Sequence, residues 1–192
     1  MSALPTSPRL MSRKNTALLI VDVQDAFRDV VIDFDQMVWN IDRLAQAANL
    51  FGIPVAATTQ YSKGLGTTVE QLASYSNPQL DKLTFSCREL NNLFEEWNRK
   101  GVSAIVVTGI ELHVCILQTV MDLLSYGFDI YLPVDAVSGR LALDANTAIK
   151  RMRDAGTIVT TCETAMFEWC ESAVDPCFKQ ISDLAKQTYS IN

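Results

Sequence analysis

Histidine is almost absent from this chain of 192 residues, which holds a single one, His113. A metal site built from several histidines is therefore excluded, and any Ser-His-Asp or Cys-His catalytic arrangement would have to use that residue. The five cysteines form no CxxC pair, and no apolar run is long enough to cross a membrane. Together with the lack of a secretory signal, these features predict free thiols in a reducing compartment, with neither a metal nor another cofactor.

Positive charge is scarce as well. The chain has 16 Lys and Arg against 22 Asp and Glu, a net charge of −6. Three of the basic residues and none of the acidic ones lie in residues 1–15, so the rest of the chain holds 13 basic and 22 acidic side chains. A nucleic-acid groove needs a basic face, so we expect no nucleic-acid partner, and the lack of a long apolar run predicts no membrane partner either.

The first fifteen residues differ in composition from the rest of the chain. They carry three Ser, two Pro and three basic residues, a composition that predicts a flexible N-terminal arm over residues 1–15. Residues 16–192 are enough for one domain and too few for two. We expect a cytoplasmic protein. A mitochondrial presequence is the alternative, because such segments are basic, Ser-rich and poor in acid, although the arm lacks a clear amphipathic helix pattern.

One pattern recurs along the chain: a helical segment, a glycine, and then an apolar strand. Each glycine suits a left-handed helix C-cap, which a Cβ would disfavour. Apolar strands that alternate with helices predict a three-layer α/β/α fold with a mainly parallel, doubly wound, Rossmann-like sheet of about six strands. Its sites should lie at the carboxyl edge of the sheet. The four helices expected in this pattern span residues 35–51, 88–100, 114–126 and 141–155.

Cys115 is the most informative residue of that pattern. It lies in the first turn of a predicted helix, 114–126, which follows a predicted strand, 103–109. Unpaired backbone N–H groups and the positive end of the helix dipole favour thiolate over thiol at such a position. The residue is therefore a candidate nucleophile, and a small residue packed in the core is the alternative, since free cysteines are often buried.

Three polar residues could assist such a nucleophile. Asp22 ends the apolar first strand, where a buried carboxylate needs a partner; capping the next turn is the alternative, although Asp25 could do that equally well. Lys82 follows a long connection, 60–79, and could supply a cation to a buried carboxylate and thiolate. His113 is two residues from Cys115, a spacing at which helical side chains do not face each other, so we interpret it as a turn or pocket residue rather than a base.

With these residues the chain resembles the isochorismatase-like cysteine hydrolase superfamily, and most closely its eukaryotic isochorismatase-domain-containing members. The resemblance runs from Thr16 to the C-terminal helix, so that residues 16–192 form an isochorismatase-like hydrolase domain. The segments that carry it are Ile-Val-Asp-Val-Gln-Asp-Ala-Phe at 20–27, Lys-Leu-Thr-Phe-Ser-Cys at 82–87, Thr-Gly-Ile-Glu-Leu-His-Val-Cys at 108–115, Val-Asp-Ala-Val-Ser at 134–138 and Thr-Gln-Tyr-Ser-Lys-Gly-Leu-Gly at 59–66.

The resemblance implies a catalytic triad of Asp22, Lys82 and Cys115. It also implies a cis peptide bond between Ile110 and Glu111, which would direct the Glu111 N–H and that of Cys115 toward one point. Two N–H groups so placed would form an oxyanion hole.

Further residues are expected around the substrate. Gln60 and Tyr61 are candidates for the pocket, and His113 is a third. Phe27 and Phe85 are expected to form an apolar wall of the pocket, with a place in the core as the alternative for both.

Two departures from the superfamily's patterns narrow the function. Nicotinamidases carry an Asp-x-His…His metal site after the second strand, where this chain has Thr-Thr-Gln-Tyr-Ser-Lys at 58–63. Isochorismatases of siderophore pathways lack the nucleophilic cysteine, which is present here. The resemblance therefore implies a metal-independent, amidase-like cysteine hydrolase that acts on a small amide or related acyl substrate through a thioester, assembled as a homo-oligomer such as a dimer or tetramer. The alternative is a non-catalytic or redox-sensing oligomeric module on the same fold.

Overall fold

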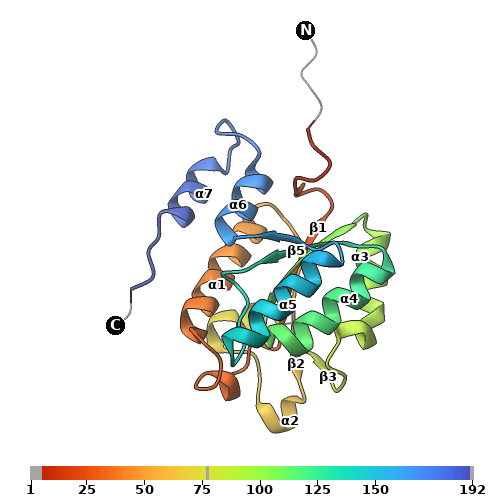
Figure 1. Ribbon diagram of the computed structural model, residues 1–192. Helices are drawn as coiled ribbons and strands as arrows, with labels where there is room; N and C mark the ends of the chain where they lie inside the picture. The colour runs from red at the N-terminus through yellow and green to blue at the C-terminus, as the bar shows by residue number, and fades with distance from the viewer. Residues whose placement is uncertain (1–5, 77, 191–192) are drawn as a thin grey trace.

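Six parallel strands form one sheet, with helices on both of its faces (Figure 1). The computed structural model describes residues 6–76 and 78–190. The strands are β1 (Thr16–Val21), β2 (Val55–Gln60), β3 (Leu80–Lys82), β4 (Ala104–Gly109), β5 (Asp129–Pro133) and β6 (Ile158–Thr160). The helices are α1 (Phe34–Leu50), α2 (Ser62–Leu65), α3 (Asn91–Arg99), α4 (Leu117–Tyr126), α5 (Ala142–Asp154), α6 (Cys162–Cys170) and α7 (Phe178–Ala185).

The strand order is β3-β2-β1-β4-β5-β6, and every neighbouring pair is parallel. The chain winds from β1 toward β3 on one side and from β4 toward β6 on the other. The order therefore reverses between β1 and β4, which is where open α/β sheets bind their ligands. The predicted three-layer, doubly wound fold is confirmed, and the sheet is parallel throughout.

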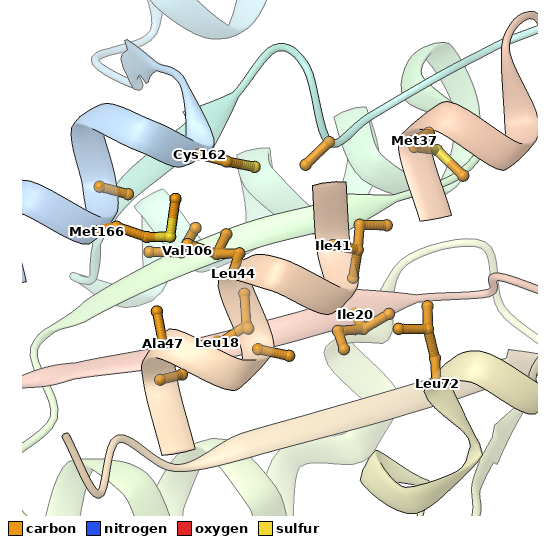
Figure 2. Close-up of a cluster of buried hydrophobic side chains, with 14 of the residues drawn as sticks. Leu18, Ile20, Met37, Ile41, Leu44, Ala47, Leu72, Val106, Cys162 and Met166 are labelled. Carbon is orange, nitrogen blue, oxygen red and sulfur yellow. The ribbon is translucent and has the colours of Figure 1, made fainter. Parts of the chain in front are cut away.

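Side chains of β1 alternate between two separate apolar layers. Leu18 and Ile20 pack with α1 and α6, whereas Leu19 and Val21 face the layer that α3, α4 and α5 cover. Figure 2 shows the first layer, in which side chains of β1, α1 and α6 meet. Because both faces are covered, the strand is apolar along its whole length, as in other parallel sheets.

Gly109 allows β4 to end close against β1 at the reversal point. Its φ is +107°, and a Cβ at this position would lie 2.1 Å from the carbonyl oxygen of Val21. The next residue, Ile110, donates its N–H to that same carbonyl at 2.9 Å. The chain can therefore turn from β4 toward the following helix only with glycine at this position.

The segment before β1 contacts the domain, which differs from the expected flexible arm. Met11 is buried in the α1–α6 layer, and its N–H donates to Glu168 at 2.8 Å. Arg13 pairs with Asp175 at 2.6 Å. From Met11 onward the segment is therefore part of the packed structure. Residues 1–5 of the expected arm lie outside the described residues.

Two further elements differ from expectation. The connection 60–79 contains α2 and a 3₁₀ helix, Glu70–Tyr75, rather than an irregular loop. Helix α6, which was not predicted, begins directly after β6. Within residues 6–76 and 78–190, the helices are all too short or too polar to cross a bilayer.

Candidate active site

The three predicted triad residues lie at the carboxyl edge of the sheet. Asp22 directly follows β1, Lys82 is the last residue of β3, and Cys115 lies in a π-helical turn, Leu112–Ile116, that leads into α4. All three are buried, with exposures of 1%, 2% and 7%. The fold thus collects at one edge three residues that are up to 93 positions apart in the sequence.

Asp22 is fixed by its backbone and by both carboxylate oxygens. Its φ of 55° lies in the left-handed region, and its N–H donates to the carbonyl of Thr58 at 3.1 Å. Oδ1 accepts a hydrogen bond from the Thr58 hydroxyl at 2.8 Å, and Oδ2 accepts one from the ammonium of Lys82 at 2.6 Å. The carboxylate therefore has charge-assisted and neutral partners despite its burial.

Lys82 is surrounded by oxygen acceptors. Its Nζ donates to Asp22 Oδ2 at 2.6 Å, Gln60 Oε1 at 2.7 Å and the carbonyl of Phe85 at 2.9 Å, and it lies 3.2 Å from the carbonyl of Thr84. An ammonium has three N–H donors, so these acceptors occupy all of them. Lys82 therefore serves as a fixed positive charge and has no donor left for the thiol or a substrate.

The pKa values of the three groups follow from burial and from one another. Burial raises the pKa of Asp22, against the opposing effects of Lys82 and Thr58. Burial acts to lower the pKa of Lys82, but Asp22 and the neighbouring cysteines raise it on balance. Burial and the carboxylate of Asp22 raise the pKa of Cys115 to about 12, although Lys82 acts in the opposite direction.

The raised pKa favours Cys115 as a thiol at neutral pH, which is opposite to the direction that its helix position alone predicts. The dipole at the start of a helix is equivalent to about half a charge, whereas Asp22 brings a full negative charge into the same buried site. Loss of solvation adds to this effect, because burial disfavours the charged form of the thiol.

The turn before Cys115 has the implied backbone arrangement. The peptide bond between Ile110 and Glu111 is cis. Among residues 6–76 and 78–190, the Glu111 N–H has no acceptor, whereas the next N–H, of Leu112, donates to the Ser138 carbonyl at 2.8 Å. The Glu111 carboxylate pairs with Arg140 at 2.6 Å. An unoccupied N–H at the start of the nucleophile's turn is suited to bind a substrate oxygen.

Of the predicted pocket residues, three lie beside the triad. Gln60 contacts Lys82 directly, and its Nε2 donates to the carbonyl of Leu83 at 2.9 Å. Tyr61 follows Gln60 and is half exposed. Phe85 is also half exposed, and its own carbonyl accepts from Lys82. The two aromatic rings therefore lie at the rim of the site.

The other two predicted pocket residues have further contacts. Phe27 is half-buried and packs against the apolar layer that contains α1. His113 lies against Gly139, and its Nε2 is 4.0 Å from Asp144 of α5. The same imidazole lines a cavity together with Thr84, in the turn after Lys82, so its place as a pocket residue stays a prediction.

Several supporting residues were not predicted. Thr58 holds Asp22, and Gln24 binds the backbone at the end of β2. Glu89 accepts the N–H groups of Leu83 and Thr84 at 2.7 and 2.9 Å, which shapes the turn after Lys82. Of these, Gln24 lies three residues after the buried strand β1, and that position is the signal by which it could have been found.

Cys87 is a second thiol next to the triad. It is fully buried, 4.0 Å from the Thr58 hydroxyl, and burial together with Asp22 raises its pKa to about 12. It contributes to the raised pKa values of both Lys82 and Cys115. Because its own pKa is raised, Cys87 is an uncharged thiol beside Cys115 at neutral pH.

A cavity of about 980 Å³ lies away from the three predicted triad residues, between residues 6–12 and α6, at the opposite edge of the sheet. We place the site by its chemistry, because no cysteine and no lysine line that cavity. Within residues 6–76 and 78–190, no three His, Cys, Asp or Glu side chains are grouped so that they could hold a metal ion.

Comparison with known proteins connects this arrangement to one family. The family model described as "Isochorismatase domain" matches residues 16–164. The human isochorismatase domain-containing protein 2 is 34% identical over 90% of this chain and 84% of its own length. The structure of MAR1 ribonuclease from Caenorhabditis elegans is 35% identical, covers 91% of each chain and superposes with a TM-score of 0.84.

A more distant structure shares the fold alone. The YcaC gene product of Escherichia coli, described as an octameric hydrolase of unknown specificity, is 20% identical. It covers 88% of this chain and 85% of its own, with a TM-score of 0.78.

Proposed function

Because the chain belongs to the isochorismatase family, we propose that it is a cysteine hydrolase with Asp22, Lys82 and Cys115 as its catalytic triad. Its substrate is a small amide or a related acyl compound, cleaved without a metal through a thioester. The observation that carries the proposal is the buried ion pair of Asp22 and Lys82, 2.6 Å apart, beside a cysteine at the start of a helix.

In the first half of the reaction, Asp22 accepts the proton of the Cys115 thiol as the sulfur attacks the carbonyl carbon. The raised pKa of Asp22 makes this carboxylate a stronger base than an exposed one. Lys82 stabilises the negative charge that forms, because its ammonium is fixed next to Asp22. The oxyanion of the tetrahedral intermediate binds the N–H groups of Glu111 and Cys115.

In the second half, Asp22 returns its proton to the leaving amine, and a thioester remains on Cys115. A water molecule then loses a proton to Asp22 and attacks the thioester carbonyl. Collapse of this intermediate releases the acid, and the proton on Asp22 returns to the sulfur. Every proton thus passes through Asp22, and Lys82 transfers none.

The direct test is turnover of a panel of small amides by the wild-type protein and by Cys115→Ala. We expect release of the amine by the wild type, loss of turnover in Cys115→Ala, and a thioester adduct on Cys115 in the mass spectrum. Turnover that survives in purified Cys115→Ala would contradict the triad. A reactive Cys115 without turnover of any amide would favour the non-catalytic or redox-sensing module instead.

The likeness to a protein named a ribonuclease supports a second candidate, cleavage of RNA at the same site. Its charge opposes this candidate, because the chain carries a net charge of −6 and binding to the phosphate backbone requires basic surface. The test is incubation of labelled RNA with wild type and Cys115→Ala. Cleavage that the variant abolishes would favour the ribonuclease, and cleavage by both would identify a contaminant.

We also propose a homo-oligomer in the cytoplasm. The octameric state described for the YcaC gene product supports the assembly, although that protein shares only the fold. Sedimentation or light scattering would measure the state, and a monomer at micromolar concentration would contradict it. A mitochondrial location stays the alternative.

A further inference from the structure

Both polar atoms of the Gln60 side chain take part in hydrogen bonds within the site. Its Oε1 accepts from Lys82 Nζ at 2.7 Å, and its Nε2 donates to the carbonyl of Leu83 at 2.9 Å. The orientation of the amide is fixed chemically, because an ammonium can only donate and a carbonyl can only accept. The side chain therefore connects the end of β2 to the ammonium of Lys82.

Gln24 fixes the backbone from which that side chain extends. It is fully buried, two residues after Asp22. Its Oε1 accepts the N–H of Gln60 at 2.9 Å, while its Nε2 lies 3.2 Å from the Gln60 carbonyl and donates to the carbonyl of Gly66 at 2.7 Å. One buried amide therefore binds both sides of Gln60 and closes the turn that includes α2.

We propose that Gln24 and Gln60 are positioning residues that act in series to hold the Lys82 ammonium against Asp22. Gln24 fixes the backbone of Gln60, and the Gln60 amide supplies the neutral acceptor that restrains Lys82 opposite the carboxylate. This inference rests on the proposed function, because the ammonium so placed is the charge that assists Cys115.

The restraint matters because Lys82 is a flexible side chain in a buried site. A lysine has four rotatable bonds in its stem, and its ammonium is a point charge without a preferred direction. Two backbone carbonyls of the turn at 84–85 hold it from one side, and Asp22 holds it from another. Without the Gln60 amide, the neutral acceptors that remain are the two carbonyls of that turn, the farther one at 3.2 Å, so the ammonium moves toward the turn and away from its place opposite the carboxylate.

The test follows the rate at which iodoacetamide alkylates Cys115 between pH 6 and 10, read by peptide mass mapping. The variants are Gln24→Met, Gln60→Met and the double variant, since methionine keeps the chain length and removes the amide. We expect each single variant to slow alkylation about tenfold at neutral pH and to move the profile upward by about one pH unit. The titratable groups that act on Cys115 in this profile are Asp22, Lys82 and Cys87.

The double variant distinguishes action of Gln24 through Gln60 from independent effects of the two changes on the fold. If Gln24 acts through Gln60, the double variant is no slower than the slower single variant, because both changes remove the same restraint. Asn40→Leu is the matched control: this buried amide also holds a loop, by donating to the carbonyl of Asp135, but lies outside the site. We expect it to lower stability and leave the alkylation profile unchanged.

Four outcomes decide between the proposals. Reduced and non-additive rates with an unchanged Asn40→Leu profile support the inference. Single variants with the wild-type profile, or effects that multiply in the double variant, overturn it and leave the triad intact. If Cys115 of Asp22→Asn is alkylated as fast as Cys115 of the wild type, the proposed function and this inference are overturned together. If Gln24→Met does not fold, the pH profile of Cys115 alkylation in Gln60→Met decides the inference alone, since Gln60 is only half-buried.

Discussion

Replacing Lys82 with methionine removes the cation from the most buried ion pair of the site. The Lys82 side chain is 0% exposed and that of Asp22 is 2% exposed, with 2.6 Å between Nζ and Oδ2. Removal of one partner from a buried pair typically costs about 3–5 kcal/mol, since the other charge stays without compensation. The Gln60 amide and two backbone carbonyls lose their donor as well. We therefore expect the free energy of unfolding to fall by about 4 kcal/mol at pH 8.

The loss should depend on pH with a defined sign. Burial already raises the pKa of Asp22 in the wild type, and without Lys82 this pKa rises further. The folded variant then binds a proton that the unfolded chain, with an Asp pKa of about 3.9, has released. Its stability therefore falls as pH rises above about 4, by at most about 1.4 kcal/mol per pH unit, until the folded pKa is passed. Wild-type Lys82, with its raised pKa, contributes fully below about pH 10.4.

Urea unfolding at pH 5 and pH 8 measures both quantities. We expect the difference in unfolding free energy between wild type and Lys82→Met to be smaller at pH 5, where Asp22 of the variant is protonated. Lys100→Met is the control, because its pair with Glu96 is exposed and screened by solvent, so its loss should change stability little. A loss below 1 kcal/mol at pH 8, or an equal loss at both pH values, would refute this reasoning.

Three shorter predictions concern packing and thiol access. Gly109→Ala places a Cβ 2.1 Å from a β1 carbonyl and should cost more than about 3 kcal/mol in urea unfolding, against about 1 kcal/mol for Gly101→Ala, whose Cβ meets nothing within 4 Å. Met11→Ala should cost about 2 kcal/mol by the same assay, whereas an unattached arm would give no change. Iodoacetamide should label Cys177 in the folded protein and Cys87 only after unfolding; early labelling of Cys87 would contradict its full burial.

The elements with local signals could be predicted from the sequence. A glycine with positive φ follows each of the helices that precede β2, β4, β5 and β6, as the spacing of the glycines predicted. Helix α6 was not predicted because no glycine follows it: its C-cap is Glu171, with a φ of 61°. The helix also begins only two residues after the last residue of β6. Its start signal was present, since the Thr161 hydroxyl accepts the N–H of Thr164.

The family resemblance implied the grouping of Asp22, Lys82 and Cys115, and the structure places them at one edge because parallel strands bring their carboxyl ends together. The partners of Lys82 could not be predicted, because two of them are backbone carbonyls whose positions depend on the turn that Glu89 shapes. The direction of the Cys115 pKa shift also required the fold. It depends first on burial and then on the nearby carboxylate of Asp22, whereas the local helix position alone favours the opposite direction.

The direction of a side chain that follows a strand also could not be predicted. Phe27 and Phe85 both follow strands by a few residues, yet one packs against α1 and the other lies half exposed at the rim. His113 lies two residues before the nucleophile and still contacts α5 rather than the triad. Tertiary packing decides these orientations, because Phe27 and Phe85 both follow a strand and their position in the sequence does not distinguish them.

The central claim is that Asp22 is the base that takes the proton of Cys115. The decisive measurement is the rate of Cys115 alkylation at neutral pH in Asp22→Asn, with the exposed Asp25→Asn as control. The account predicts a rate at least about 100-fold lower than in the wild type, because the proton has no acceptor. An unchanged or faster rate would contradict it, because removal of the carboxylate lowers the pKa of Cys115 and would speed a thiolate that reacts without a base.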